Sequence, residues 1–293
     1  MAARKRGACR AILLLAGVLG AAGCSGARAR YPLRGVVQAV LPDGRAEVAH
    51  EDIPGFMPAM TMPFRIRGAS GVRPGDRIEA TLAMRDTDSW LEDVRILARG
   101  LPVARRASAP EPARIGTLVP DLRLVNQDGA PIGLAGYRGG VLVLTFIYTR
   151  CPVPDFCPRM MARLSELDDR LAADPALLEK TRLLAISFDP EFDTPEVLRY
   201  YGKGWVKDRG RGRFDRFALA SGSAEQVRAA ADFFGVSFWN EEGQIVHSFC
   251  TAVIDADGRL AALFDGNEWT ADELLREVRA AAARRAKTAR QGS

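Results

Sequence analysis

One segment in the second half of the chain most constrains the fold, because it joins a buried strand, a cysteine loop and a helix. Residues 140–148, GVLVLTFIY, form a continuous apolar run with β-branched side chains, which is typical of a strand buried on both faces of a sheet. The proline-rich loop that follows carries Cys151 and Cys157, and residues 158–171, PRMMARLSELDDRL, have apolar side chains at helical spacing. A strand that leads through a short loop into a helix predicts an α/β architecture.

The alternation of strand and helix continues further along the chain. Residues 181–189 and 217–222, TRLLAISFD and FALASG, are strand-like. A helical segment follows each of them, beginning at Thr194 with Pro195 in its first turn, or at Ser223. Threonine and serine are favoured N-cap residues, and proline is favoured at the first helical position. These segments predict consecutive βα units.

The C-terminal part predicts a hairpin and a closing helix. VHSFCTAVID, residues 246–255, and RLAALFDG, residues 259–266, flank a DADG turn, and residues 269–283 have helical periodicity. Strands that alternate with helices and finish in a hairpin and a helix predict a thioredoxin-like α/β domain over residues 115–283.

The first third of the chain has a different pattern. Between residues 31 and 99, short alternating segments are separated by turns such as PDG and RPGD. Strands of period two at this spacing predict a small all-β barrel, similar to an OB fold, although a sandwich fits the same pattern. Residues 100–114, GLPVARRASAPEPAR, lack periodicity and are rich in Pro, Ala and Arg, which indicates a linker.

The N-terminus has the pattern of an export signal. A basic stretch is followed by the apolar run AILLLAGVLGAA and by GCSG, which are the regions of a secretory signal peptide over residues 1–24. Cys24 lies where the cysteine of a bacterial lipobox would be lipidated, although Ala21 stands where leucine is usual. The alternatives are plain cleavage or an uncleaved anchor. We expect the protein at the periplasmic side of the cell envelope, attached to a membrane through lipid on Cys24.

The net charge of +5 is concentrated at the ends of the chain. Arg284, Arg285, Lys287 and Arg290 form a basic tail over residues 284–293. No aromatic side chains alternate with these charges, so the sequence does not indicate a nucleic-acid surface.

The cysteine loop has the residues of a soft-metal or redox site. Cys157 directly precedes the helix that starts at Pro158, and a helix N-terminus favours a thiolate. Two thiolates suit Cu(I) or Zn, and the imidazole of His247, on the VHSFC segment, is available to complete a site. A structural disulfide between the two loop cysteines is the alternative. Cys250 is expected to be a small buried side chain on the opposite face of the strand from His247.

A second group of soft ligands lies in HEDIPGFMPAMTM, residues 50–62. Met60 and Met62 are two residues apart, so they project from the same face of a strand. Thioether sulfur selects Cu(I) over harder ions, and His50 is available to add a nitrogen. The alternative is that both methionines only fill the barrel core.

Residues 115–280 resemble the Sco/SenC family of thioredoxin-fold copper chaperones for cytochrome oxidase assembly. The resemblance is carried by VPDLRLVNQDG, TFIYTRCP…CP, ISFDPEFDTPEVLRYY, VHSFCTAVIDADG and DGNEWTADELL. It implies that Cys151, Cys157 and His247 bind copper, as Cu(I) or Cu(II), and it makes Asp189 a further candidate ligand. Five residues separate the two cysteines here, whereas the family pattern has three, which puts the transfer of copper geometry and disulfide potential in question.

Residues 31–99 resemble the small periplasmic copper- and silver-binding barrel of the Cus efflux system, through the histidine and the PxMTM signature. The resemblance implies that His50, Met60 and Met62 bind the ion. Met57 stands where the family has a tryptophan that caps the metal, so Met57 is a candidate third thioether or a shield.

Together these features predict an exported copper chaperone that delivers copper to the copper-bearing subunit of a cytochrome oxidase. Three alternatives remain at the level of sequence. The first is a thiol-disulfide reductase that acts through Cys151 and Cys157 on the cysteines of the oxidase. The second is a copper-resistance binding protein. The third is a thiol peroxidase, for which the TRC segment supplies Thr149 and Arg150.

Overall fold

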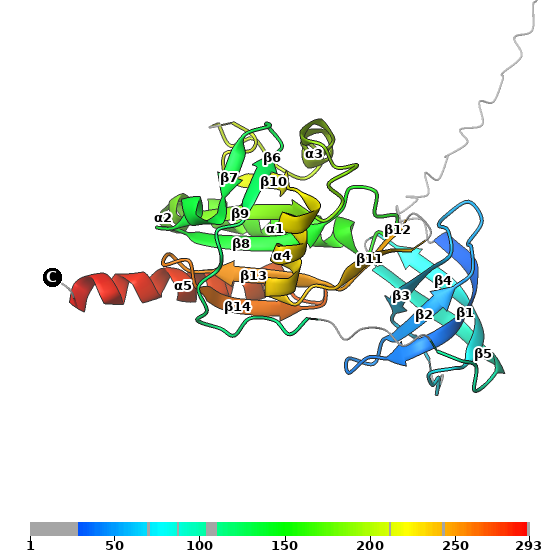
Figure 1. The fold of residues 1–293 in the computed structure, drawn as a ribbon. Coiled ribbons are helices and arrows are strands. Elements are labelled where there is room, and N and C mark those ends of the chain that lie inside the picture. Colours follow the sequence, from blue (N-terminus) through cyan, green and yellow to red (C-terminus); the bar gives the residue numbers. More distant parts are fainter. Residues whose placement is uncertain are drawn as a thin grey trace, which may run out of the picture.

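The computed structural model describes residues 29–68, 71–86, 88–103, 110–210, 212–241 and 244–291. The expected signal segment and Cys24 lie outside these residues. The chain forms a five-stranded sheet from its first hundred residues and a seven-stranded sheet with helices from the rest (Figure 1). Within the described residues, no helix combines the length and the apolar character needed to cross a membrane.

The N-terminal sheet is antiparallel throughout, with the strand order β3-β2-β1-β4-β5. Alternate residues of each strand face the same side of the sheet. The residues on the inner side are mostly apolar and form its core. Ile66, which follows β3, bridges Leu91 of β5, so the two edges of the sheet approach each other. The strands are β1 (Ala29–Val40), β2 (Ala46–His50), β3 (Met60–Phe64), β4 (Arg77–Arg85) and β5 (Asp88–Ala98).

The second sheet has the order β14-β13-β8-β9-β10-β6-β7. Its central strands β8, β9 and β10 are parallel, and the β13–β14 hairpin adds antiparallel to β8. A parallel βα core extended by a C-terminal hairpin is the thioredoxin-like arrangement, which confirms the predicted fold class. The strands are β6 (Arg123–Asn126), β7 (Pro131–Gly133), β8 (Val141–Ile147), β9 (Thr181–Ser187), β10 (Phe217–Ser221), β13 (Cys250–Ile254) and β14 (Leu260–Asp265).

The helices start where the cap residues place them. Thr194 and Ser223 accept hydrogen bonds from the backbone N–H groups of Val197 and Gln226, as their sequence context predicts. Helices α1 and α5 pack against each other and against β8. The helical elements are η1 (Leu134–Tyr137), α1 (Cys157–Ala172), α2 (Pro175–Lys180), α3 (Pro195–Gly202), α4 (Ala224–Phe234) and α5 (Ala271–Gln291).

Two expected boundaries differ from the structure. The segment 246–255 is not one strand, because β12 (Gln244–His247) ends before Ser248 and β13 begins at Cys250. Strand β12 instead pairs with β11 (Phe238–Glu241) in a separate hairpin. Helix α5 continues to Gln291, so the basic segment after residue 283 extends the helix instead of forming a separate tail.

The β11–β12 hairpin reaches from the α/β unit to the N-terminal sheet, where β12 contacts β3 (Figure 1). At its far end the carboxylate of Glu241 accepts hydrogen bonds from the backbone N–H and the hydroxyl of Thr61, at 3.1 and 3.3 Å. Thr61 lies between the two methionines of β3. The hairpin thus joins the strand that carries His247 to the strand that carries Met60 and Met62.

Candidate metal centres

The cysteine loop and the end of β12 bring three soft ligands together. The ligand atoms of Cys151, Cys157 and His247 all lie within 4.8 Å of one another. The Cys157 Sγ atom is 3.8 Å from Nε2 of His247. We call this group the thiol centre. All three cysteines in the described part of the chain are free thiols.

His247 is held in the tautomer that a metal ligand needs. Its Nδ1 donates to the carbonyl of Ser248 at 3.0 Å, so the lone pair lies on Nε2, the atom that faces Cys157. The ring is enclosed by four aromatic side chains with centroid distances between 4.7 and 6.2 Å, namely Tyr148, Phe156, Phe188 and Phe249. This enclosure fixes the orientation of the imidazole and excludes water from one side of the centre.

The two sulfurs differ in their protonation. Burial opposes ionisation of Cys151, but the interactions with the neighbouring Cys157 thiol and His247 ring outweigh it and hold the pKa of the Cys151 thiol well below its usual value. Burial, together with the neighbouring Cys151 sulfur, raises the pKa of Cys157. Cys157 is the first residue of α1, yet the expectation that it is the ionised thiol does not hold, because burial and the adjacent thiolate outweigh the helix terminus.

Asp189 lies outside this cluster of ligand atoms. Its carboxylate accepts hydrogen bonds from Nε and Nη2 of Arg150, at 3.1 and 2.6 Å. Arg150 directly precedes Cys151, so Asp189 holds the start of the cysteine loop. Asp193, which no sequence motif indicated, acts beside it: its buried carboxylate accepts from the Thr149 backbone N–H at 3.0 Å. The two carboxylates together anchor the residues that lead into Cys151.

A second soft group lies on paired strands of the N-terminal sheet. His50 of β2 is directly opposite Met60 of β3, and Val48 is opposite Met62. Side chains of opposed residues, and of residues two apart, share one face of a sheet, so His50, Met60 and Met62 project from the same face. All three are at most 4% exposed. We call this group the thioether centre.

The imidazole of His50 has one unused ring nitrogen. Its Nδ1 donates to the carbonyl of Glu51 at 2.7 Å, whereas Nε2 is buried and has no hydrogen-bond partner among the residues that the structure describes. Burial lowers the pKa of His50, although the carboxylates of Glu241 and Asp52 work against it. A neutral, buried imidazole with a free lone pair beside thioethers fits a Cu(I) ligand set. As a core residue only, His50 would leave a buried polar atom unsatisfied, which is rare.

Met57 and Trp90 are the other residues of interest in this region. Met57 is buried and its backbone pairs with Ile53, in the turn that joins β2 to β3. Trp90 stacks under the guanidinium of Arg67, with Cζ 3.4 Å from the ring centroid. The guanidinium of Arg67 therefore covers one face of that indole ring.

Cys250 has the role expected of a buried core thiol. It is 3% exposed, and burial raises the pKa of its thiol. The expected face relation to His247 does not apply, since the two residues lie on different strands.

One cavity adjoins the thiol centre, and another lies near the end of α1. A cavity of about 560 Å³ lies between the two sheets, with His247 and Cys250 on one wall and Arg45, Glu47 and Pro63 on the other. It adjoins the thiol centre at His247, whereas Cys151 and Cys157 are not among its lining residues.

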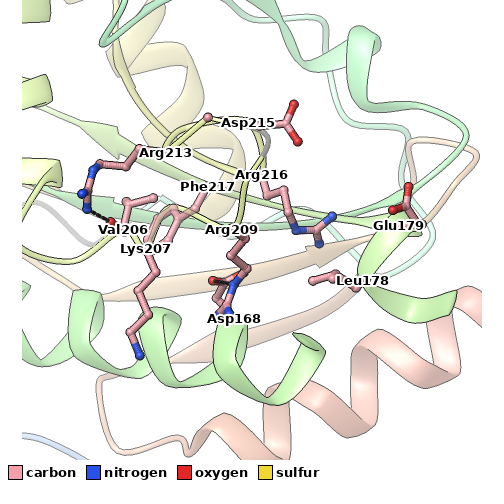
Figure 2. A pocket seen from close by; sticks show the side chains of 11 residues that line it. Asp168, Leu178, Glu179, Val206, Lys207, Arg209, Arg213, Asp215, Arg216 and Phe217 are labelled. Atoms are coloured by element: carbon pink, nitrogen blue, oxygen red, sulfur yellow. Dashed lines mark hydrogen bonds and ion pairs between the residues drawn. The ribbon is translucent and has the colours of Figure 1, made fainter. Parts of the chain in front are cut away.

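A second cavity, of about 60 Å³, lies near the end of α1 (Figure 2). Its cationic lining is already engaged, because Arg209 pairs with Asp168 at 2.7 Å and Lys207 pairs with Asp169. Arg213 donates to the carbonyl of Val206. We assign no binding role to this cavity.

The fold and the two centres define a class of protein, a thioredoxin-like unit with a cluster of two cysteines and a histidine, joined to a strand-rich unit with a buried histidine and two methionines on one face. Residues 111–283 match the family model SCO1/SenC, and the chain belongs to that family. Residues 30–96 match the model "Copper binding periplasmic protein CusF". Both predicted resemblances are confirmed, and copper is the ion they support. The second match also supports an exported location.

The chain is also similar to individual proteins. The SCO1 protein homolog of Bacillus subtilis is 27% identical over 161 residues, which are 53% of this chain and 78% of that protein. The mitochondrial SCO2 homolog of Homo sapiens is 27% identical over 198 residues, 65% of this chain and 68% of that protein. The crystal structure of a SCO1/SenC family lipoprotein from Bacillus anthracis is 25% identical, with a TM-score of 0.49, and the alignment covers 56% of this chain and 94% of that one.

Proposed function

We propose that the protein is an exported copper chaperone that delivers copper to the copper-bearing subunit of a cytochrome oxidase during its assembly. The observation that carries the proposal is the thiol centre, in which two sulfurs and the free Nε2 of His247 lie within 4.8 Å of one another. Such a ligand set suits Cu(I), and its partial burial keeps the ion from water. The cavity beside His247 gives a recipient's ligands a route to the ion.

The thioether centre provides a second Cu(I) site. The free Nε2 of His50 and the shared face with Met60 and Met62 support this role. Uncharged thioethers bind Cu(I) without releasing a proton, whereas the thiol centre must lose one. The thioether centre is therefore suited to collect copper and to donate it to the thiol centre.

The β11–β12 hairpin supports transfer between the two centres. Its tip at Glu241 is bound to Thr61 of the methionine strand, and its other end carries His247. Strand β12 runs from Gln244 to His247, and at about 3.3 Å per residue these positions are roughly 10 Å apart. Because both centres belong to one chain, the effective concentration of one for the other is high.

Anaerobic Cu(I) titration against a chromophoric chelator tests the proposal. We expect the wild-type protein to bind two ions. The double variant Cys151→Ala/Cys157→Ala and the double variant Met60→Leu/Met62→Leu should each bind one. Leucine keeps the volume of methionine, so the fold should be retained.

Matched controls separate ligation from folding. Cys250→Ala removes a thiol outside the centre, and Met84→Leu changes a buried methionine of β4. Both controls should bind two ions. One ion in the wild-type protein, unchanged by the Met60→Leu/Met62→Leu substitution, would reduce the thioether centre to core packing.

A thiol-disulfide reductase is the second candidate, and the lowered pKa of the Cys151 thiol supports it. A reductase needs both cysteines but does not need the imidazole. A His247→Ala variant that restores full oxidase assembly in cells lacking the protein would favour the reductase. A deletion strain that assembles oxidase normally but loses copper tolerance would instead favour a copper-resistance protein.

Membrane attachment through lipid on Cys24 belongs to the same proposal. Mass spectrometry of the mature N-terminus should show a diacylglyceryl cysteine at position 24. A Cys24→Ser variant should be released in soluble form if the lipid is the only anchor, and an unmodified mature N-terminus in the wild-type protein would contradict the proposal.

A further inference from the structure

The loop between the two cysteines is bound by the N-terminal sheet. Asp155 lies inside this loop, two residues before Cys157, and its side chain is 7% exposed. One carboxylate oxygen accepts hydrogen bonds from the backbone N–H of Ser89 at 3.2 Å and from its hydroxyl at 2.9 Å. The same oxygen accepts from Nη2 of Arg65 at 3.1 Å. Both partners belong to the N-terminal sheet unit. Asp155, the one acid between the two cysteines, is therefore held across the interface between the two units.

Other charges make this contact part of a network. Arg159, in the first turn of α1, is 4% exposed and forms ion pairs with Asp155 and with Asp88. Arg65 also pairs with Asp88 and with Glu268, each at 3.2 Å. Two arginines and three acids, contributed by both units, thus form one network of ion pairs. A buried ion pair of this kind adds little net stability but strongly penalises the loss of one partner, so it fixes one arrangement of the interface.

The backbone of the loop is fixed at the same point. The carbonyl of Asp155 accepts from Nδ2 of Asn267 at 2.6 Å. The next residue, Phe156, packs edge-on against Phe249 at 4.8 Å and lies against the ring of His247. Only Phe156 separates Asp155 from Cys157, so the interface controls where the second sulfur can move.

This position matters because ligation and disulfide formation need different arrangements of the sulfurs. A disulfide requires an S–S distance of about 2.05 Å and a defined torsion. In the structure the sulfurs are free thiols and lie with His247 at the spacing of a metal site. Closing the disulfide must bring the sulfurs, which lie within 4.8 Å of each other, to bonding distance. The contacts of Asp155 with Ser89 and Arg65 resist any shift of the loop that accompanies this change.

We propose that Asp155 is a positioning residue through which the N-terminal sheet holds the cysteine loop in its metal-binding arrangement and disfavours its closure to a disulfide. The second unit thereby has a role apart from binding an ion, since its docking raises both the Cu(I) affinity of the thiol centre and the midpoint potential of the thiol pair. The affinity part rests on the proposed copper function, whereas the redox part does not.

The redox test uses the metal-free full chain equilibrated with oxidised and reduced dithiothreitol. The two thiols lose two electrons and two protons to form the Cys151–Cys157 disulfide, and oxidised dithiothreitol takes up both to become the dithiol. The fraction of disulfide is read by alkylation and mass spectrometry. Variant Arg65→Gln removes a contact from the sheet side and leaves the loop sequence intact. We expect disulfide formation to become about tenfold more favourable, which is a fall of about 30 mV in midpoint potential.

Three variants make the result specific. Asp155→Asn should give a shift of the same sign, and the double variant Arg65→Gln/Asp155→Asn should shift less than the sum of the two, because both act on one contact. Arg77→Gln is the control, since Arg77 lies on the same sheet but pairs only with the exposed Glu51 at 2.7 Å. Its potential should equal that of the wild-type protein.

Cu(I) competition on the same proteins distinguishes the two proposals. Weaker binding at the thiol centre in Arg65→Gln, with the shifted potential, supports both. A shifted potential in a protein whose thiol pair binds no copper would support the positioning role and overturn the copper function. An Arg65→Gln protein that unfolds at the wild-type temperature and has the wild-type potential would overturn the positioning role. The same conclusion would follow if Asp155→Asn alone shifted the potential, because the effect would then be local to the loop.

Discussion

The thiol centre and the thioether centre orient their histidines in the same way but offer copper different sulfurs. In each, Nδ1 donates to the carbonyl of the next residue, from His50 to Glu51 at 2.7 Å and from His247 to Ser248 at 3.0 Å. The two thioethers are neutral and lie on one strand, β3, which pairs with the strand of His50. The two thiols can ionise and lie at the two ends of a loop. We therefore expect one centre to be stable to changes of pH and redox state, and the other to respond to both.

Oxidation should produce the largest difference in Cu(I) binding between the two centres. Diamide converts the thiol pair to a disulfide, which has no thiolate to offer, so the thiol centre should lose its ion entirely. The thioether centre should keep its ion, because its sulfurs cannot form a disulfide. Equilibrium dialysis should give one Cu(I) per chain after oxidation and two before. The variant Cys151→Ala/Cys157→Ala should bind one ion with or without diamide, and loss of both ions from the oxidised wild-type protein would contradict the comparison.

Lowering the pH should weaken the thiol centre more than the thioether centre. Copper must displace the proton of Cys157, whose pKa is raised, so affinity should fall about tenfold per pH unit. The folded-state pKa of His50 is lowered from the free value of 6.5. His50 therefore stays unprotonated as the pH falls through 6.5, and the unfolded chain takes up that proton first, so His50 makes folding less favourable below this pH.

The measurement is a Cu(I) competition titration at pH 7.5 and pH 5.5 on variants with one centre each. The thiol centre should lose roughly a hundredfold in affinity over this range, and the thioether centre much less. An equal loss at both centres would contradict the proposed difference in sulfur chemistry.

The thioether centre should depend on the close approach of β1 to β2. A Cβ atom at Gly35 would lie 2.6 Å from the carbonyl oxygen of Ala49 and 2.8 Å from Cα of His50. We expect Gly35→Ala to displace His50, to cost about 1–3 kcal/mol in urea unfolding, and to weaken Cu(I) binding at the thioether centre. Gly136→Ala is the matched control, because nothing lies within 4 Å of its Cβ position. A Gly35→Ala protein with unchanged copper binding would place His50 outside the ligand set.

Asp189 should have the smallest effect. Its carboxylate is bound to Arg150, so Asp189→Asn should loosen the start of the cysteine loop and lower Cu(I) affinity by about 1 kcal/mol or less, the size of one lost polar contact. His247→Ala, which removes a ligand, gives the scale for comparison in the same titration. A loss in Asp189→Asn as large as in His247→Ala would make Asp189 a ligand.

The sequence predicted the two fold classes because these depend on local patterns. It also named the residues that the structure brings together in each centre. The apolar run 140–148 and the cap residues Thr194 and Ser223 specify their elements without help from distant parts of the chain. Met60 and Met62 share a face in any strand, and pairing of β2 with β3 adds His50 to it.

What the sequence did not predict depends on contacts between distant segments. The pKa of Cys151 is lowered and that of Cys157 is raised, because burial and the neighbouring sulfur affect Cys157 more than the helix terminus does. The interface role of Asp155 has no local signal, since its partners Ser89 and Arg65 lie 66 and 90 residues away. The division of the 246–255 segment into two strands likewise follows from pairing with β11.

Transfer of copper from the thioether centre to the thiol centre is the central claim, and one measurement tests it directly. The disulfide form is loaded with a single Cu(I), which only the thioether centre can hold, and the disulfide is then reduced with a phosphine. Ultraviolet thiolate-to-copper absorption is followed by stopped flow. We predict that the absorption appears at a rate independent of protein concentration, and that it is absent when Met60→Leu/Met62→Leu is treated in the same way. A rate proportional to protein concentration, or no absorption from the wild-type protein, would contradict transfer within one chain.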